Sequence, residues 1–161
     1  MDDITYSPIG TIHSPFKDIE GMPIQPAGAK NVEGTVELNP ELAAGLKDLE
    51  GFSHVILLYH FHRSKGYSLD VVPFLDNTPR GVFATRAPRR PNPIGLSVVR
   101  LKRISGNTLH VQDVDVLDGT PLLDLKPFVP KFDNRETERV GWLSDKADNA
   151  DLMKADRRFA E

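Results

Sequence analysis

Residues 94–111 read Ile-Gly-Leu-Ser-Val-Val-Arg-Leu-Lys-Arg-Ile-Ser-Gly-Asn-Thr-Leu-His-Val, and this stretch says most about the fold. Runs rich in β-branched residues, which favour strands, stand on both sides of Gly106-Asn107. A Gly-Asn pair between two such runs is a signal for a hairpin with a two-residue turn. The stretch therefore predicts two antiparallel strands, near Ile94–Ile104 and near Thr108–Leu117.

Glycine and proline punctuate the rest of the chain in the same way. Thirteen prolines and twelve glycines among 161 residues leave little room for long helices. A short helix is predicted from Asn39-Pro40 to about Leu49, because Asn suits the N-cap and Pro the first helical position. A polar helix is predicted from Ser144 through Arg158. Further strands are predicted near Tyr6–His13, Val32–Leu38, His54–His62, Gly81–Thr85 and Pro121–Leu125.

The order of these elements indicates the fold class. Consecutive strands joined by short turns favour an antiparallel sheet that curls into a barrel or a sandwich. Strands and helices do not alternate, so a doubly wound nucleotide-binding fold is not expected. Two long loops, Ser14–Lys30 and Arg63–Pro79, interrupt the strands, and loops of that length in a compact domain are usually functional or mobile. We expect an all-β chain with minor α content.

Composition excludes several classes of protein. The best apolar run, Val55–Leu58, is far shorter than the roughly 20 residues of a membrane helix. The start, Met1-Asp2-Asp3, is acidic and so differs from the basic end of a signal peptide. The absence of cysteine excludes disulfides, zinc ribbons and thiol nucleophiles, and suits a cytoplasmic protein. Phosphate-loop, dinucleotide, zinc-protease and serine-hydrolase motifs are also absent.

The charges are unevenly distributed. Net charge is −3, but no Asp or Glu occurs between Asp76 and Asp113, where the balance is +7 and leaves −10 for the remainder. Affinity for phosphate depends on such local clustering, so RNA is a candidate partner. Solvated strands that lack acids explain the same pattern, and charge alone leaves both explanations open. The basic residues are Arg80, Arg86, Arg89, Arg90, Arg100, Lys102 and Arg103.

The densest feature is the segment Thr85–Gly95, which carries three prolines, three arginines and Asn92. Proline restricts its own backbone and that of the preceding residue, so this loop is expected to be stiff. A preorganised loop costs little entropy when it binds, and the planar guanidinium group suits phosphate, carboxylate or a stacked base. The segment is therefore a candidate binding site.

Two weaker features accompany this loop. Asp115 to Pro121 places two acids where a strand is predicted to end, although Asp118-Gly119 is also an ordinary turn signal. His60 and His62 are two apart on a predicted strand, so their rings would share one face, together with His54. No third ligand is apparent, so packing or hydrogen bonding is expected of these histidines and no metal site is predicted.

Five segments together resemble the TrmO family (TsaA-like or VirR-like) of S-adenosylmethionine-dependent tRNA methyltransferases. The resemblance covers roughly residues 4 to 133, and the block A-T-R-x-P-x-R-P-N-P-I-G-L-S is highly specific. The matching segments are Ile9 to Phe16, Gly51 to Val55, Gly81 to Arg86, Arg90 to Ser97 and Asp118 to Pro127.

This resemblance implies a single antiparallel β-barrel domain, assigned to residues 1–140, and the predicted polar helix assigns a helical tail to residues 141–161. It also implies a homodimer with the cofactor near the subunit interface, and methylation of N6 of threonylcarbamoyl-adenosine at position 37 of tRNA. Arg86 and Asn92 are expected to hold the modified base and its carboxylate. By similarity, the S-adenosylmethionine site comprises Gln25, Pro26, Ala27, Phe61, His62, Arg86, Leu96, Asp115, Val116, Leu117 and Asp118.

The sequence departs from the family pattern at two places. The first loop reads Ile24-Gln25-Pro26-Ala27 where members commonly have Arg-Gln-Pro-Gly, which weakens any charge contact there. Residues 141–161 are expected to form only a short helical tail where some members carry a long extension, so the RNA contacts are expected in the basic stretch instead. These expected contacts are Arg89, Arg90, Arg100, Lys102 and Arg103.

Other functions remain open at this stage. A non-catalytic RNA-binding barrel would keep the basic stretch but have no use for a cofactor pocket. A related methyltransferase acting on another RNA base or on a small molecule would keep the pocket. An interaction module whose histidines bind metal would need neither.

Overall fold

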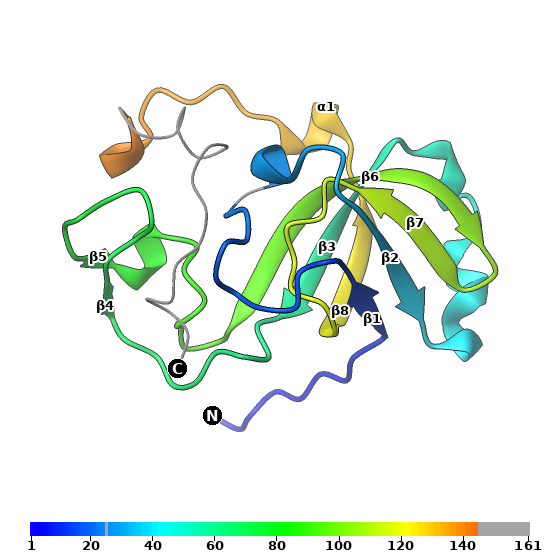
Figure 1. The fold of residues 1–161 in the computed structure, drawn as a ribbon, viewed down its shortest axis with the longest axis horizontal. Coiled ribbons are helices and arrows are strands. Elements are labelled where there is room, and N and C mark those ends of the chain that lie inside the picture. Colours follow the sequence, from blue (N-terminus) through cyan, green and yellow to red (C-terminus); the bar gives the residue numbers. More distant parts are fainter. Residues whose placement is uncertain (25, 145–161) are drawn as a thin grey trace.

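Six antiparallel strands close into a barrel in the order β1-β2-β7-β6-β3-β8 (Figure 1). The computed structural model describes residues 1–24 and 26–144, so the predicted helix that runs from Ser144 through Arg158 lies, after its first residue, outside the described residues. The barrel confirms the all-β prediction. Its strands are β1 (Gly10–His13), β2 (Glu33–Leu38), β3 (His54–His60), β6 (Ile94–Ser105), β7 (Thr108–Gln112) and β8 (Thr120–Pro127).

The barrel interior is packed with the inward residues of every strand. On β3, Val55, Leu57 and Tyr59 are buried and alternate with half-buried neighbours. On β6, the inward positions include Ser97 and Val99, both at most 1% exposed. A six-stranded barrel of this kind is filled by its side chains, so any ligand must bind outside it.

The predicted hairpin is confirmed, but its second strand is shorter than expected. Ser105 pairs with Thr108, and Gly106 has φ +62°, which glycine adopts without strain. The strand β7 ends at Gln112 and not at Leu117, because the next residue, Asp113, turns into the left-handed region with φ +69°. The segment that follows crosses one end of the barrel.

The other predicted strands differ mainly at their ends. The first begins at Gly10 instead of Tyr6, whose side chain is exposed, and the third ends at His60 instead of His62. The strand predicted near Pro121–Leu125 extends over all of β8. The prediction for Gly81–Thr85 is wrong: only β5 (Arg80–Gly81) is a strand there, paired with β4 (Asp70–Val71), and a 3₁₀ turn, η4 (Val82–Ala84), follows.

The predicted internal helix forms as two 3₁₀ segments, η2 (Pro40–Leu46) and η3 (Leu49–Gly51). Asn39 makes no capping bond; its side-chain amide donates to the Pro8 carbonyl instead, at 3.3 Å. Asp48, with φ +71°, interrupts any continuous helix. The remaining short helical elements are η1 (Pro26–Ala29), α1 (Pro130–Asp133) and η5 (Gly141–Leu143). Within the described ranges, no helix is long and apolar enough to span a membrane.

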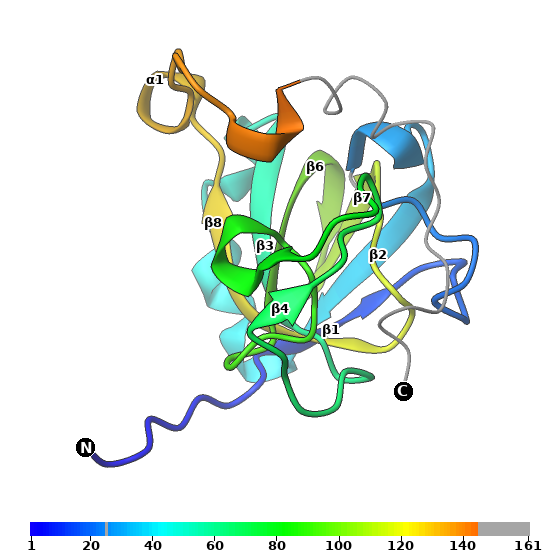
Figure 2. The same ribbon diagram turned by 90° about the vertical axis from the view of Figure 1, so that its left-hand side faces the viewer.

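A small lobe, residues 70–90, stands beside the barrel and holds β4, β5 and η4. It lies at the left of Figure 1 and toward the viewer in Figure 2. Val71, Val82 and Ala87 form its own apolar cluster, against which Phe74 packs. Phe74 also packs against a second cluster, Met22 with Leu117, that belongs to the first long loop and the barrel end. This shared ring joins the lobe to the barrel.

Candidate functional site

A cavity of about 1020 Å³ lies where the barrel end, the first long loop, the lobe and η5 meet. Tyr59 and Leu96 line it from the barrel, Met22 from the first loop, Arg86 from the lobe side and Trp142 from η5. Its walls are mostly apolar with few polar groups, which is the usual make-up of small-molecule sites. Both long loops, which the sequence marked only as functional or mobile, therefore contribute walls of the cavity.

A chain of three polar side chains reaches this cavity, which Tyr59 and Asp115 line while Ser97 links them from behind. Tyr59 Oη lies 2.8 Å from Ser97 Oγ, and Ser97 Oγ donates to Asp115 Oδ1 at 2.6 Å. Tyr59 and Ser97 are held inside the barrel, whereas Asp115 comes from the segment that crosses the barrel end. The barrel core thus orients a carboxylate that lines the cavity.

Burial governs the ionisation of this chain. It raises the pKa of Asp115 from 3.8 to about 6, and the Ser97 hydrogen bond and the Arg86 charge only partly offset it. Burial also raises the pKa of Tyr59, and the nearby Asp115 charge adds to the rise. A carboxylate with a raised pKa in a cavity is a candidate functional group, because it is held ready to bind a cation or a proton.

Gly95 makes room for the aromatic rings at this end. A Cβ atom there would collide with the rings of Tyr59 and Phe61. The two rings meet edge to face, with centroids 5.6 Å apart and planes at 85°. Because glycine lacks a side chain, β6 can pass close to both rings and hold Phe61 at the cavity wall.

Arg86 and Asn92, the predicted substrate contacts, are not brought together. Arg86 is exposed, lines the cavity and makes no hydrogen bond or ion pair with the rest of the described chain. Asn92 is exposed outside the cavity, and its carbonyl accepts the backbone N–H of Ile94. Only Arg86 is therefore placed to meet a ligand in the cavity.

Arg90 braces the stiff proline-rich loop from within. Its Nη1 donates to the carbonyls of Thr85 and Ala87, at 2.9 and 3.1 Å, and its guanidinium lies 6.0 Å from the Phe83 ring centre. Arg89 is half-buried, and its Nε atom is buried without a hydrogen-bond partner. Both side chains are thus more enclosed than phosphate contacts on an open surface would be.

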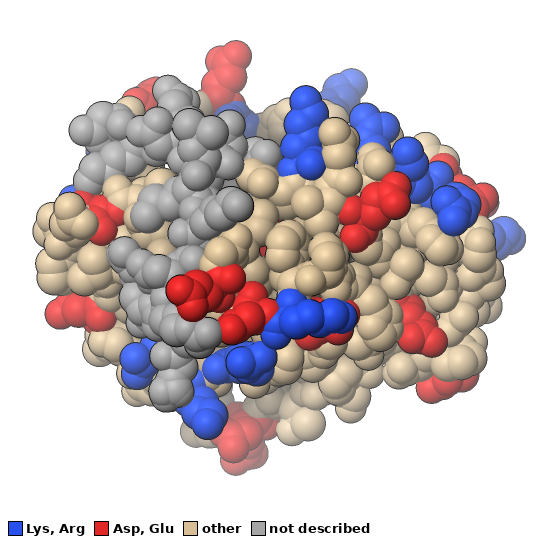
Figure 3. Space-filling model, viewed as in Figure 1, with Lys and Arg blue, Asp and Glu red and all other residues tan. Residues whose placement is uncertain are grey.

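The other predicted RNA contacts lie away from the cavity. Arg100, Lys102 and Arg103 are exposed on β6. Arg103 is seven residues beyond Leu96, roughly 23 Å along a strand. Figure 3 shows several Lys and Arg side chains along the upper right of one face, separated by tan and red side chains. The basic stretch is therefore not one continuous patch.

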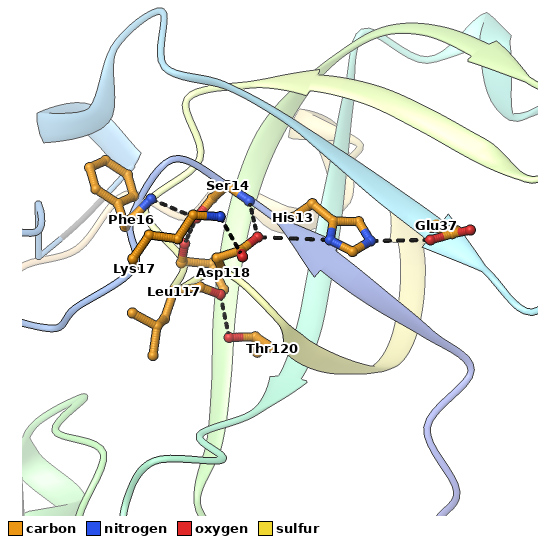
Figure 4. Close-up of polar contacts among 9 residues, drawn as sticks. His13, Ser14, Phe16, Lys17, Glu37, Leu117, Asp118 and Thr120 are labelled. Atoms are coloured by element: carbon orange, nitrogen blue, oxygen red, sulfur yellow. Dashed lines mark hydrogen bonds and ion pairs between the residues drawn. The ribbon is translucent and has the colours of Figure 1, made fainter.

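Asp118 supports a turn and does not line the cavity. Its carboxylate accepts the backbone N–H of Ser14 at 3.0 Å and pairs with Lys17 Nζ at 2.6 Å (Figure 4). The hydrogen bond from Lys17 is the main cause that lowers the pKa of Asp118. His13 lies beside it, 3.8 Å from Asp118 and 3.1 Å from Glu37. These contacts fasten the turn after Leu117 to the start of the first loop.

The remaining predicted cofactor residues divide into two groups. Gln25 lies outside the described residues, and only the backbone of Pro26 and Ala27 is described, as the start of η1. All the others line the cavity. They are Phe61, His62, Leu96, Val116 and Leu117.

His62 and His60 do not share a strand face, because β3 ends between them. His62 follows in a turn and lines the cavity, where burial lowers its pKa with help from Arg63 and His60. His54 and His60 keep the predicted even spacing on the outer side of β3. In the part of the chain that the structure describes, no three His, Asp or Glu side chains gather as metal ligands do.

Sequence reasoning missed, among others, Tyr59 and Ser97 of the polar chain and Phe74 and Trp142 of the cavity wall. Strand parity could have found the first two, because each is separated by an even number from buried apolar neighbours on its strand. The sole tryptophan of the chain was a further signal. Phe74, in a long loop, offered none.

Comparison with known proteins gives consistent matches. The profile of the tRNA-methyltransferase O N-terminal domain matches residues 11–134. A probable S-adenosyl-L-methionine-binding protein of Pyrococcus abyssi is 58% identical over 156 residues, which are 97% of this chain and 85% of that protein. A protein of Mus musculus named tRNA (adenine(37)-N6)-methyltransferase is 38% identical over 83% of this chain, but over only 32% of its own length.

The fold is matched as well. The crystal structure of TrmO from Pseudomonas aeruginosa superimposes with a TM-score of 0.74 at 41% identity, covering 88% of this chain and 63% of that one. This chain therefore spans less than two thirds of the mouse and Pseudomonas proteins. Since the profile covers well over half of the chain, the barrel with its flanking cavity belongs to the tRNA-methyltransferase O N-terminal domain family.

Proposed function

We propose that this protein is an S-adenosylmethionine-dependent methyltransferase that acts on N6 of threonylcarbamoyl-adenosine at position 37 of tRNA. The observation that carries the proposal is one cavity lined by both the Asp115 carboxylate and the exposed Arg86 guanidinium. A cationic cofactor and an anionic substrate group thus each have a partner of opposite charge. Family membership supports methyl transfer to tRNA, and the name of the mouse relative supports N6 of the adenine at position 37 as the target.

The cavity residues fit the cofactor. Asp115 can accept hydrogen bonds from its ribose hydroxyls or from its ammonium group. Phe61 presents an aromatic ring that can cover the adenine, and Leu96 adds apolar wall beside it. Gln25, Pro26 and Ala27 complete the proposed site. Asp118 contributes indirectly, because its bonds to Ser14 and Lys17 hold the turn that follows Leu117.

S-adenosylmethionine supplies, when bound, a methyl group on a positively charged sulfur. The chain's own residues then have three tasks. Arg86 holds the threonyl carboxylate by charge and planar geometry, which aims the base. The apolar walls exclude water. Asp115 holds its ligand in a fixed place, because Ser97 and Tyr59 fix the carboxylate. Orientation of this kind can supply most of the rate enhancement of a transfer reaction.

We also propose that the protein is cytoplasmic and forms a homodimer. Ile94 and Leu96 support the dimer, because these apolar side chains are 43% and 48% exposed on β6 and both line the cavity. A second copy that covers them would bring the subunit interface next to the cofactor. Analytical ultracentrifugation of the wild-type protein and of Ile94→Asp tests this, and a monomeric wild type contradicts it.

The decisive experiment measures transfer of labelled methyl from S-adenosylmethionine to two tRNA pools. One pool carries threonylcarbamoyl-adenosine and the other is made without it. We expect label in the modified pool alone. Label in neither pool, together with no cofactor binding by calorimetry, would contradict the proposal and favour a non-catalytic RNA-binding barrel.

One observation favours a second candidate, a methyltransferase of a small molecule or of another base. Two of the arginines expected to contact RNA are not available at the cavity: Arg90 braces its own loop, and Arg100 lies farther along β6. Of the predicted RNA contacts, these two would then not grip a tRNA at the cavity mouth. Equal labelling of both tRNA pools, or labelling of free nucleoside faster than of tRNA, would favour this candidate.

A further inference from the structure

Trp142 forms a wall of the cavity from outside the residues that the family profile matches. It lies on η5, eight residues beyond the end of the profile match at residue 134, and it lines the same cavity as Arg86. None of the residues expected from the family resemblance is on this segment. The wall it forms therefore needs its own explanation.

The lobe fixes the orientation of the indole ring. Its Nε1–H donates to the Ala84 carbonyl at 2.8 Å, and the Arg80 guanidinium stands 5.7 Å from the ring centre. Arg80 is itself held by Nε, which donates to the buried Asp76 carboxylate at 2.6 Å. The ring is thus preorganised and pays little entropy on binding.

The position of the Ala84 carbonyl, to which the indole donates, indicates which ligand the ring faces. Ala84 ends η4, and Arg86, proposed to hold the substrate carboxylate, follows two residues later. Phe83 on the same turn is 74% exposed and also lines the cavity. The lobe side of the cavity therefore presents aromatic rings beside a free cation. Asp115 and Leu96 belong to the barrel side.

Aromatic side chains are the usual platforms for unstacked bases, because every base has a flat face that stacks regardless of its edge. The cavity volume of about 1020 Å³ is at the upper limit for a single small-molecule site, so a cofactor and a nucleoside can share it. A base in a tRNA loop can leave its stack and enter such a cavity.

We propose that Trp142 is the stacking platform for the target adenine, on the lobe side of the cavity, while the cofactor occupies the barrel side. This inference rests on the proposed function and names a positioning residue for it. Removing the ring then weakens binding of the modified tRNA and leaves binding of S-adenosylmethionine unchanged.

The first test uses the fluorescence of the wild-type protein, because Trp142 is the only tryptophan among 161 residues. The protein is saturated with S-adenosylhomocysteine and titrated with the free nucleoside N6-threonylcarbamoyl-adenosine. We expect quenching by the nucleoside and little change from S-adenosylhomocysteine alone. Quenching by S-adenosylhomocysteine with no further change on adding the nucleoside would overturn the inference.

The second test compares Trp142→Leu, which removes the aromatic face, with Trp142→Phe, which keeps it and loses the Nε1–H bond. Phe132→Leu is the matched control, because this C-terminal aromatic is 71% exposed and outside the cavity wall. We expect Trp142→Leu to raise the KM for modified tRNA roughly 10- to 100-fold, the scale of one base–aromatic stack, with the cofactor Kd unchanged. Trp142→Phe and Phe132→Leu should stay within about threefold of wild type.

Two outcomes of the second test overturn the inference. One is an equal loss in Trp142→Leu and Trp142→Phe, which would make the residue a structural brace. The other is a change confined to cofactor affinity. Failure of the proposed function looks different: the wild-type protein itself then transfers no methyl group to tRNA.

Discussion

Ser97 Oγ donates a hydrogen bond of 2.6 Å to Asp115 Oδ1 across 18 residues of sequence. The hydroxyl has one proton, so the Tyr59 hydroxyl must donate to Ser97 in turn, at 2.8 Å. Ser97 is 1% exposed and Tyr59 is 6% exposed, so the interior of the barrel fixes the direction of a carboxylate outside it. A chain of hydrogen bonds therefore links the packed core to the proposed cofactor site.

Replacing Asp115 with Asn should stabilise the protein while weakening cofactor binding. The folded-state pKa of about 6 lies above the ordinary 3.8, so the wild type loses stability as pH rises from about 4 to about 6. Asn carries no charge and avoids this loss. The free energy of unfolding, measured with urea, should favour Asp115→Asn by up to about 3 kcal/mol at pH 7, because one pKa unit is 1.36 kcal/mol. A variant that is less stable than wild type at pH 7 contradicts the assignment.

Cofactor binding should depend on pH through the same group. The Asp115 carboxylate binds a cation only when ionised, so affinity for S-adenosylmethionine should increase as pH rises through about 6. Ser97→Ala removes the hydrogen bond that lowers this pKa, and the midpoint should move to higher pH. Isothermal titration calorimetry from pH 5 to 8 measures both curves. Identical midpoints in the two proteins would show that Ser97 does not act on Asp115.

Ser97→Ala should also destabilise the fold through Tyr59. The variant leaves the buried Tyr59 hydroxyl without its partner, which typically costs about 1–3 kcal/mol. The double variant Tyr59→Phe/Ser97→Ala removes both groups and should be more stable than Ser97→Ala alone. Chemical unfolding at pH 7 gives the comparison. Strict additivity of the two single variants would mean that the hydroxyls are not coupled.

Gly95→Ala should damage both stability and the cavity. The new Cβ meets the rings of Tyr59 and Phe61, and overpacking of this kind costs roughly 1–3 kcal/mol. Gly45→Ala is the control, because a Cβ at Gly45 meets nothing within 4 Å. The melting temperature and the affinity for the cofactor should both decrease for Gly95→Ala. Both should stay at the wild-type value for Gly45→Ala. Equal effects in the two variants would refute the steric explanation.

Reversing the charges of Arg100, Lys102 and Arg103 should weaken tRNA binding without touching the cofactor. These side chains are exposed on β6, so their replacement by Glu leaves the core intact. If they contact phosphate, the KM for tRNA rises and its dependence on salt becomes less steep. The cofactor Kd is the internal control. If the dependence of the KM for tRNA on salt concentration is unchanged, these three side chains do not contact the phosphates, and the RNA must bind elsewhere. Arg90 is a poor choice for this test, because its loss breaks two loop hydrogen bonds.

The regular strands could be predicted because their signals are local. The residues that predict the hairpin at Gly106, and those that predict a strand at Val55–Leu58, lie within a few positions of one another. The stretch after Gly81 could not be predicted: its β-branched and aromatic residues suit a strand, but the lobe packs Val82 in its own cluster through a 3₁₀ turn. Long-range packing overrides local preference there.

The sequence predicted many of the residues at the site, but not the residues with which their side chains form hydrogen bonds. Seven of the cofactor residues expected from the family resemblance line the cavity, although only Arg86 and Leu96 belong to the specific block that carries the resemblance. Sequence could not reveal that Arg90 turns inward to its own loop, or that Lys17, 101 residues away, holds Asp118. Such pairings depend on the direction of a side chain, which no spacing in the sequence specifies.

The cavity draws its walls from Ile19 near one end of the described chain to Leu143 near the other. During synthesis, a nascent chain cannot present this cavity until almost all of these residues have left the ribosome. A ligand that fills it therefore binds the finished fold and not its precursors, and it stabilises that fold by mass action. A chain cut before Trp142 and Leu143 lacks part of the wall, so it should gain less stability from such a ligand.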